Sequence, residues 1–293
     1  MTVAQLQDCG LNLVEWDGST PHRLLDSEGL QIGILAGRPR ADSWNHVIAE
    51  AELAMRTAQQ DLGERWHAHG KFGLVNGGIS FGGGEKKPGN FKPTPALRFK
   101  VLDHLLNIEA FRRIAGFGSS ILQCYAPALY TYYMETLESL LDKDVSLRHN
   151  FATSVFAACT FNIGPCTVTH PYIDAKNLAW GFCAITALGN FNPDAGGHLV
   201  LWDLGLIIRF PPGSTILIQS AVLTHSNVPV IEGDERFSFT QYSAAGIFRW
   251  VHNHHQSDKD LLGSADEDKR LEFQSAKITR WAEGLTMLER FNK

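Results

Sequence analysis

The sequence predicts an α+β protein in which a jelly-roll core of short strands is flanked by helices. From about residue 151, β-branched and aromatic runs alternate with turns such as NPDAGG and PPGS, the spacing of an all-β barrel or jelly roll. Before this point the chain shows helical patterns, and the tail 266–292 returns to them. We expect one domain, 1–293, with a helical and loop part (1–150), a jelly-roll core (151–252) and a C-terminal helical tail (253–293).

The N-terminal part begins with a strand predicted at 30–38. A helix follows over 41–62, with Asp42 or Ser43 as its N-cap. Gly and Pro interrupt 74–96, so this segment is not regular throughout. Its Lys86 and Lys87 suit either a lid loop near the barrel mouth or an ordinary exposed hairpin. Further helical patterns cover 97–114 and 120–142.

Seven runs are the candidate strands of the core: FATSVFAACTFNI, CTVTHPYID, GFCAITALGNF, GHLVLWDL, LIIRFPP, STILIQSAVLTH and FSFTQYSAAGIFRWV. A regular strand over CTVTHPYID would put His170, Tyr172 and Asp174 on one face, because side chains alternate with a period of two. The tail helix is expected to pack on the outside of the sheet.

Composition limits the classes of function. Hydrophobic residues make up 44% of the 293 and charged residues 19%, as in ordinary globular proteins. The net charge of −5 gives nucleic-acid binding no support, although it leaves open a basic groove on an acidic body. The five cysteines contain no CxxC pair, which favours reduced thiols. The sequence shows neither a secretory signal nor a membrane-length apolar run, so we expect no membrane partner and an intracellular location, cytoplasmic or nuclear.

Three residues of the core suggest a metal centre. A jelly roll that binds Fe(II) takes two ligands from an early strand and one from a later strand, in a set of two His and one carboxylate. Asp174 and His225 suit two of these places. Arg236, further along the chain, could grip a carboxylate with two hydrogen bonds, or it could pair with Glu235 or Asp234 at the surface.

Long motifs carry a family resemblance. They are VTHPYIDAKNLAWGFCAITALG, GGHLVLWDL, FPPGSTILI, SAVLTHSN and ERFSFTQYSAAGIFRWV, together with LAGRPR (35–40) and GGISFGGGEKKPGN (77–90). With these motifs, most of the chain resembles the TET/JBP-type 2-oxoglutarate and Fe(II)-dependent dioxygenases, and their large fungal branch in particular. The resemblance implies a double-stranded β-helix, Fe(II), 2-oxoglutarate, O₂ and hydroxylation of a substrate C–H bond.

The resemblance also implies a role for individual residues. Asp174 falls on the metal carboxylate of the family, His225 on its distal histidine and Arg236 on the arginine that holds the co-substrate. The first metal histidine would fall at position 172, where this chain has Tyr172.

Three hypotheses for the metal site follow from this difference. In the first, Tyr172 is itself a ligand, and copper becomes an alternative metal because a phenolate binds Fe(III) or Cu(II) better than Fe(II). In the second, His170 replaces it, although along a regular strand it would lie roughly 6–7 Å away. In the third, the site is degraded. Asn162 is a candidate contact of the co-substrate, and Asn177 could orient a metal ligand or the substrate from behind.

We therefore expect a non-haem metal-dependent oxygenase that hydroxylates or oxidises a C–H bond. The resemblance points to the methyl group of 5-methylcytosine, so a methylated nucleobase and a small molecule are the alternative substrates. Two other functions stay open. One is a jelly-roll binding module without redox chemistry, and the other is an Fe or Cu oxygenase that does not use 2-oxoglutarate.

Overall fold

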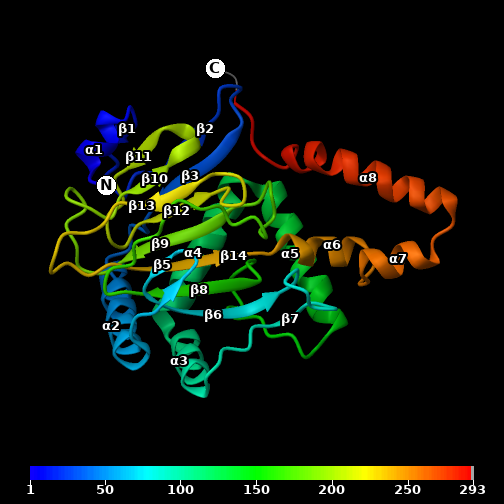
Figure 1. The fold of residues 1–293 in the computed structure, drawn as a ribbon, viewed down its shortest axis with the longest axis horizontal. Helices are drawn as coiled ribbons and strands as arrows, with labels where there is room; N and C mark the ends of the chain where they lie inside the picture. Colours follow the sequence, from blue (N-terminus) through cyan, green and yellow to red (C-terminus); the bar gives the residue numbers. More distant parts are fainter. Residues whose placement is uncertain (292–293) are drawn as a thin grey trace.

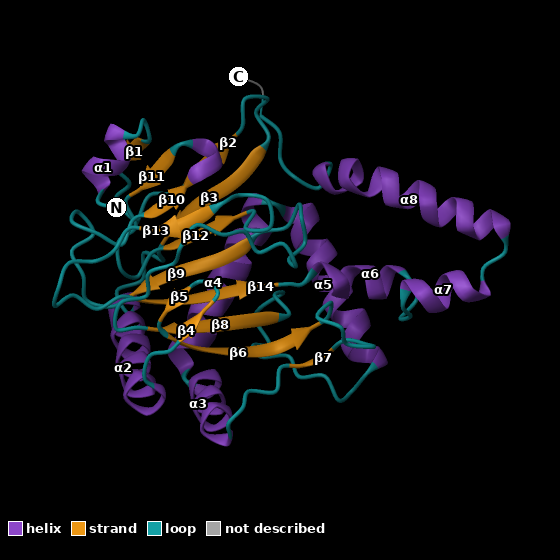
Figure 2. Cartoon of the chain, in the orientation of Figure 1, coloured by secondary structure: helices purple, strands orange, loops and turns teal. Residues whose placement is uncertain are grey.

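The computed structural model describes residues 1–291 and contains two principal β-sheets with helices around them (Figure 1 and Figure 2). The larger sheet has the strand order β2-β3-β12-β9-β14-β8-β6-β7. The bounds of these strands are β2 (His22–Leu25), β3 (Gln31–Gly37), β12 (Thr215–Ile218), β9 (Cys183–Leu188), β14 (Phe237–Tyr242), β8 (Ala158–Ile163), β6 (Gly73–Ser80) and β7 (Gly89–Asn90).

The smaller sheet has the order β1-β11-β10-β13. Its strands are β1 (Asn12–Val14), β11 (Leu206–Ile208), β10 (Leu199–Leu201) and β13 (His225–Asn227). Buried side chains of both sheets form one apolar cluster, with Ile185 and Ile216 from the larger sheet and Leu199 and Leu201 from the smaller. The two sheets therefore face each other across a shared core, and the predicted jelly roll is confirmed.

Helices cover the other face of the larger sheet (Figure 1). They are α2 (Trp44–Leu62), α3 (Ala96–Asn107), α4 (Glu109–Tyr125) and α5 (Pro127–Lys143), and a short α1 (Val3–Asp8) precedes β1. In α4, Phe111, Ile114 and Leu122 are buried at helical spacing. Phe111 lies against Phe161 of β8 and Phe239 of β14, with ring centroids 4.8 and 5.4 Å apart. This packing fixes the strands that carry the site.

The structure differs from the sequence-based expectations in the N-terminal part. The patterns at 97–114 and 120–142 form three helices rather than two, because the chain turns at Ile108 and again at Ala126, before Pro127. Strands from this part also complete both sheets, since β3 pairs with β12 and β6 with β8 in the larger sheet, and β1 pairs with β11 in the smaller one. The core therefore extends well beyond 151–252.

The segment 166–174 is not a regular strand. Its contacts to the sheets are isolated bridges, Cys166 with Arg236 and Tyr172 with His225. Pro171 lacks the N–H that a continuous ladder would need. The strand predicted over CTVTHPYID is therefore wrong, although Tyr172 still lies beside β13 at the edge of the smaller sheet.

The C-terminal tail also differs from its prediction. After β14 the chain forms α6 (Ala245–His252), where a continuing strand was expected, and then α7 (Asp258–Ser264) and α8 (Glu267–Leu285). Figure 1 shows α8 extending away from the body instead of lying on the sheet. Leu271, Ile278 and Trp281 on α8 are exposed. No helix within 1–291 is long and apolar enough to cross a membrane.

Candidate metal centre

Tyr172 and His225 lie opposite each other as an antiparallel pair. The Tyr172 N–H donates to His225 O at 3.1 Å, and the His225 N–H donates to Tyr172 O at 3.0 Å. Their ring centroids are 4.3 Å apart. His225 also pairs directly with Leu201 of β10, whose side chain lies in the core between the sheets. The His225 ring therefore faces the barrel interior, and it holds the Tyr172 ring there with it.

A backbone carbonyl group fixes the orientation of the His225 ring. Its Nδ1 lies 2.8 Å from Leu223 O, so Nδ1 carries the proton that is donated to this carbonyl, and Nε2 is left with a lone pair. Burial lowers the pKa of His225 below its usual value, although Leu223 O and Asp174 oppose this change. A neutral imidazole with its second nitrogen fixed to a carbonyl is the usual state of a histidine that binds a metal.

Asp174 lies in a turn tied to the segment after β12. Its N–H donates to Ser220 O at 2.8 Å, and the Asn177 N–H donates to Asp174 O, also at 2.8 Å. The Asn177 side chain donates to Ser220 Oγ at 3.1 Å. The turn therefore has two attachments to Ser220, and Asn177 supports the backbone that carries the Asp174 carboxylate.

Arg236 is a buried cation, 1% exposed. Its Nη1 donates to Thr167 O at 2.9 Å, but within residues 1–291 its Nε has no hydrogen-bond partner. Burial lowers the pKa of Arg236 to about 10, against the influence of nearby Tyr172, so the guanidinium stays charged at neutral pH. Among the described residues no carboxylate forms an ion pair with it. An unpaired buried charge is costly, and a carboxylate ligand would relieve this cost.

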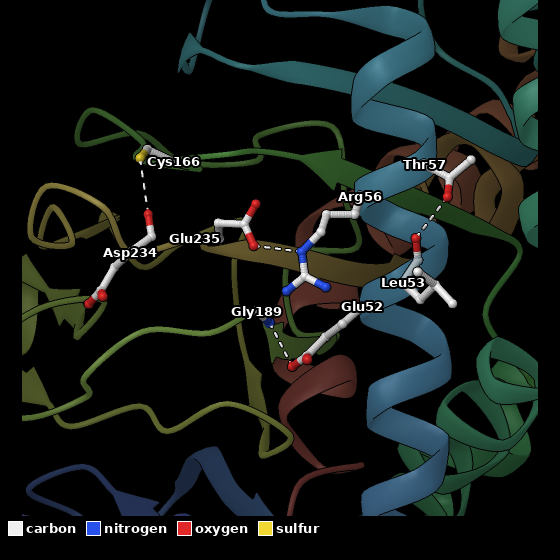
Figure 3. Close-up of polar contacts among 8 residues, drawn as sticks. All are labelled: Glu52, Leu53, Arg56, Thr57, Cys166, Gly189, Asp234 and Glu235. Carbon is white, nitrogen blue, oxygen red and sulfur yellow. Dashed lines mark hydrogen bonds and ion pairs between the residues drawn. The ribbon is translucent and has the colours of Figure 1, made fainter.

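The two acidic residues before Arg236 use their carboxylates elsewhere, and Figure 3 shows this for Glu235. Glu235 Oε2 lies 2.6 Å from Arg56 Nε of α2, and an Asp234 oxygen accepts the Asn192 N–H at 2.9 Å. The surface pair of Arg236 with Glu235 or Asp234 that the sequence left open does not form, because Arg236 is buried and both carboxylates have other partners.

Asn162 lies on β8 opposite Ser238 of β14, and its Nδ2 donates to Ser238 Oγ at 3.0 Å. On the same strand, Thr160 Oγ1 donates to Asn76 Oδ1 at 2.8 Å and lies 3.4 Å from the Tyr242 hydroxyl. These polar side chains alternate with Phe161, which faces the helices. Part of the barrel interior is therefore polar, and Asn162 belongs to this part.

The structure does not bring His170 into the cluster. Its side chain is exposed, and only its N–H is engaged, with His69 O at 2.9 Å. Instead, His69 contacts Tyr172, with ring centroids 4.1 Å apart. Sequence reasoning missed His69. It lies more than one hundred residues before Tyr172 in the chain, and no motif marks it.

Comparisons with known proteins bear on the fold. A scan against protein-family models gives no match, and no curated protein matches the sequence. A solved structure described as NgTET1 in complex with 5mC DNA superposes over 80% of this chain and 83% of that chain, with a TM-score of 0.56 and 15% identity. The chain has the double-stranded β-helix fold of NgTET1. An oxidoreductase of the 2OG-Fe(II) oxygenase family from Burkholderia pseudomallei covers 64% of this chain and 74% of its own, at 18% identity and a TM-score of 0.34.

Whether a metal fits this site depends on the donor atoms of Tyr172, Asp174 and His225. Within residues 1–291, no three His, Cys, Asp or Glu side chains are grouped to hold a metal. The group at position 172 is a phenol, and burial, with Asp174 adding to it, raises the pKa of Tyr172 well above its usual value. A phenol oxygen, a carboxylate and a neutral imidazole are nevertheless a set that binds iron or copper. A metal would have to displace the phenol proton.

Proposed function

We propose that this chain is a non-haem metal-dependent oxygenase of the 2-oxoglutarate type. In this proposal Tyr172, Asp174 and His225 hold the metal, and Arg236 binds the distal carboxylate of 2-oxoglutarate. The single observation that supports it most is the buried, charged Arg236 inside a barrel with the NgTET1 fold. Among the described residues its Nε has no hydrogen-bond partner and its charge has no acidic partner. A dicarboxylate would supply the missing charge.

Each residue has a defined task in this site. His225 offers Nε2, because Leu223 O fixes its Nδ1. Asp174 offers its carboxylate from the turn bound to Ser220. Tyr172 must lose its phenol proton to bind, so a harder metal is favoured. Iron is the proposed metal, and copper is the alternative. When bound, the metal would activate O₂ for the oxidation of a substrate C–H bond.

The polar part of the barrel interior bears on the substrate. Asn76 and Thr160, with the Tyr242 hydroxyl, can hydrogen-bond a heterocycle, and Asp174 lies near enough to influence Tyr242. Lys176, next to the Asp174 turn, is exposed and could meet a phosphate. NgTET1 was solved with 5mC DNA. These features favour a methylated nucleobase over a small apolar metabolite, which remains the second candidate.

The first test is metal analysis combined with visible spectroscopy. Protein purified without chelators is assayed for Fe and Cu, and its spectrum is compared with those of Tyr172→Phe and of Tyr130→Phe, a control on α5. A bound metal whose phenolate charge-transfer band disappears only in Tyr172→Phe supports the proposed ligand set. A metal without this band, lost in His170→Ala, would instead support His170.

A second measurement concerns the co-substrate and the enzyme class. Calorimetric titration with 2-oxoglutarate should show binding to the metal-loaded wild type and not to Arg236→Met. If no metal binds even after anaerobic titration with Fe(II) and Cu(II), the oxygenase proposal fails. Dicarboxylate binding that persists without metal would then identify a binding module.

A further inference from the structure

The β-hairpin of β4 (Trp66–His67) and β5 (Gly70–Lys71) places an imidazole on the ring of Tyr172. The His69 and Tyr172 ring centroids are 4.1 Å apart and the planes are inclined by 48°. Tyr172 thus contacts two imidazoles, His69 at this distance and His225 at 4.3 Å. The contact with His225 comes from the barrel, whereas His69 comes from a hairpin outside both principal sheets.

The hairpin is fastened to the segment that carries Tyr172. His69 O accepts the His170 N–H at 2.9 Å. Gly70 has a φ of +152° and lies so close to Val168 O that a Cβ atom would collide with it. Phe72, directly after β5, is 1% exposed and anchors the hairpin in the interior. The backbone contacts of His69 and Gly70, together with the buried Phe72, therefore fix the position of His69.

The backbone of His69 is hydrogen-bonded, but its ring is held by packing against Tyr172. Its Nδ1 is buried and has no hydrogen-bond partner in the part of the chain that the structure describes. Aromatic rings in contact attract each other by more than the free energy that the burial of their area contributes. The Tyr172 backbone is held by the pair of hydrogen bonds with His225, but this pair is an isolated bridge, and no further bridge joins the segment 166–174 to β13. Such a bridge needs support from side chains.

We propose that His69 is a positioning residue for Tyr172, and that its ring keeps the phenol inside the barrel through aromatic contact. The effect on a bound metal rests on the function proposed above. The effect on the Tyr172–His225 pair does not, because it concerns the protein alone. The β4–β5 hairpin is then part of the site, because it supplies His69.

Amide hydrogen exchange on the metal-free protein tests the proposal, with NMR following the Tyr172 and His225 amides. His69→Ala should speed their exchange by about three- to tenfold, and His69→Phe, which keeps an aromatic ring, should stay near wild type. His170→Ala is the matched control, because that imidazole is exposed, and it should change nothing. Unchanged exchange in His69→Ala, or equal acceleration in both His69 variants, would overturn the proposal.

Metal affinity gives a second and separate readout. His69→Ala should weaken metal binding and shift the phenolate band, whereas His69→Phe should preserve both. If His69→Phe keeps slow exchange but loses the metal, His69 binds the metal through its nitrogen, and the positioning role is wrong. A wild-type protein without metal affinity would end the oxygenase proposal, while the exchange experiment would still decide the role of His69.

Discussion

Arg56 of α2 binds Glu235, the residue directly before Arg236, with 2.6 Å between Nε and Oε2. One helical turn earlier, Glu52 accepts the Gly189 N–H at 3.0 Å (Figure 3). The helix thus holds the chain just before β14 and just after β9, next to the position where Arg236 turns into the barrel. The position of Arg236 is therefore supported from the helical layer.

The first prediction concerns this ion pair. Arg56→Met should weaken 2-oxoglutarate binding by up to about fivefold, because an ion pair whose side chains are about one-third exposed contributes about 0.2–1 kcal/mol. Glu235→Gln should have a similar effect, and the double variant should be no worse than either single variant. Titration calorimetry measures the binding. Glu52→Gln, which keeps an acceptor for the Gly189 N–H, serves as the control, and a loss as large as that of Arg56→Met would contradict a specific role of the pair.

A second prediction separates stability from function at Arg236. Replacing a buried, unpaired cation by an apolar side chain of similar length relieves its desolvation cost. Arg236→Met should therefore keep the free energy of unfolding within about 1 kcal/mol of wild type, or raise it. The rise in Tm that 2-oxoglutarate causes in wild type should vanish. Thermal unfolding with and without 2-oxoglutarate tests both statements, and a loss of several kcal/mol in Arg236→Met would show that the guanidinium serves the fold itself.

Acid should destabilise the metal-free protein through buried histidines. Burial lowers the pKa of His198, which is 2% exposed, below the usual 6.5. Below about pH 6.5 the unfolded chain therefore binds more protons than the folded protein. The contribution of His198 to the free energy of unfolding is fully present above this pH and is lost as the pH falls below it. His198→Gln should reduce this slope by up to about 1.4 kcal/mol per pH unit. Urea unfolding at pH 7.5, 6.5 and 5.5 measures it.

The control for that slope is His22→Gln, because His22 is exposed on β2. It should leave the pH dependence unchanged. Equal slopes in wild type and His198→Gln would mean that His198 does not contribute to the acid sensitivity.

The glycine of the β4–β5 hairpin gives the fourth prediction. In Gly70→Ala the new Cβ would collide with Val168 O, and the φ of +152° disfavours a side chain. We expect a loss of about 1–3 kcal/mol in the free energy of unfolding. Chemical unfolding measures it against Gly89→Ala, since a Cβ at Gly89 meets nothing within 4 Å. Comparable stability of the two variants would show that the hairpin can move away from Val168.

The sequence predicts the strands of the core well because most of them alternate and are bounded by turns. It fails at 166–174, where β-branched residues suggest a strand but Pro171 and the bridge geometry leave only isolated pairs. It also fails in the tail, because helical spacing reports a helix and does not report what the helix packs against. Leu271 and Ile278 form an apolar stripe that the rest of the chain leaves exposed.

The sequence could predict only those candidate site residues whose side-chain type by itself indicates a chemical role. Asp174, His225 and Arg236 could be named from their types and order. In the structure the Tyr172 ring contacts His225, and the charges of Asp174 and Arg236 influence the pKa of Tyr172. The contact of His69 with Tyr172 depends on how the β4–β5 hairpin folds over Val168. No local periodicity records such a long-range contact.

The strand order of the larger sheet determines how this protein can be divided. β12 has β3 on one side and β9 on the other, and β8 lies between β14 and β6. A polypeptide limited to 151–252 would leave β12 and β8 as open edges, ready to pair with other chains. It would also uncover the phenylalanines that α4 shields. The barrel with its site therefore cannot be separated from the N-terminal part. A fusion protein that is to keep the site intact must include the first 150 residues.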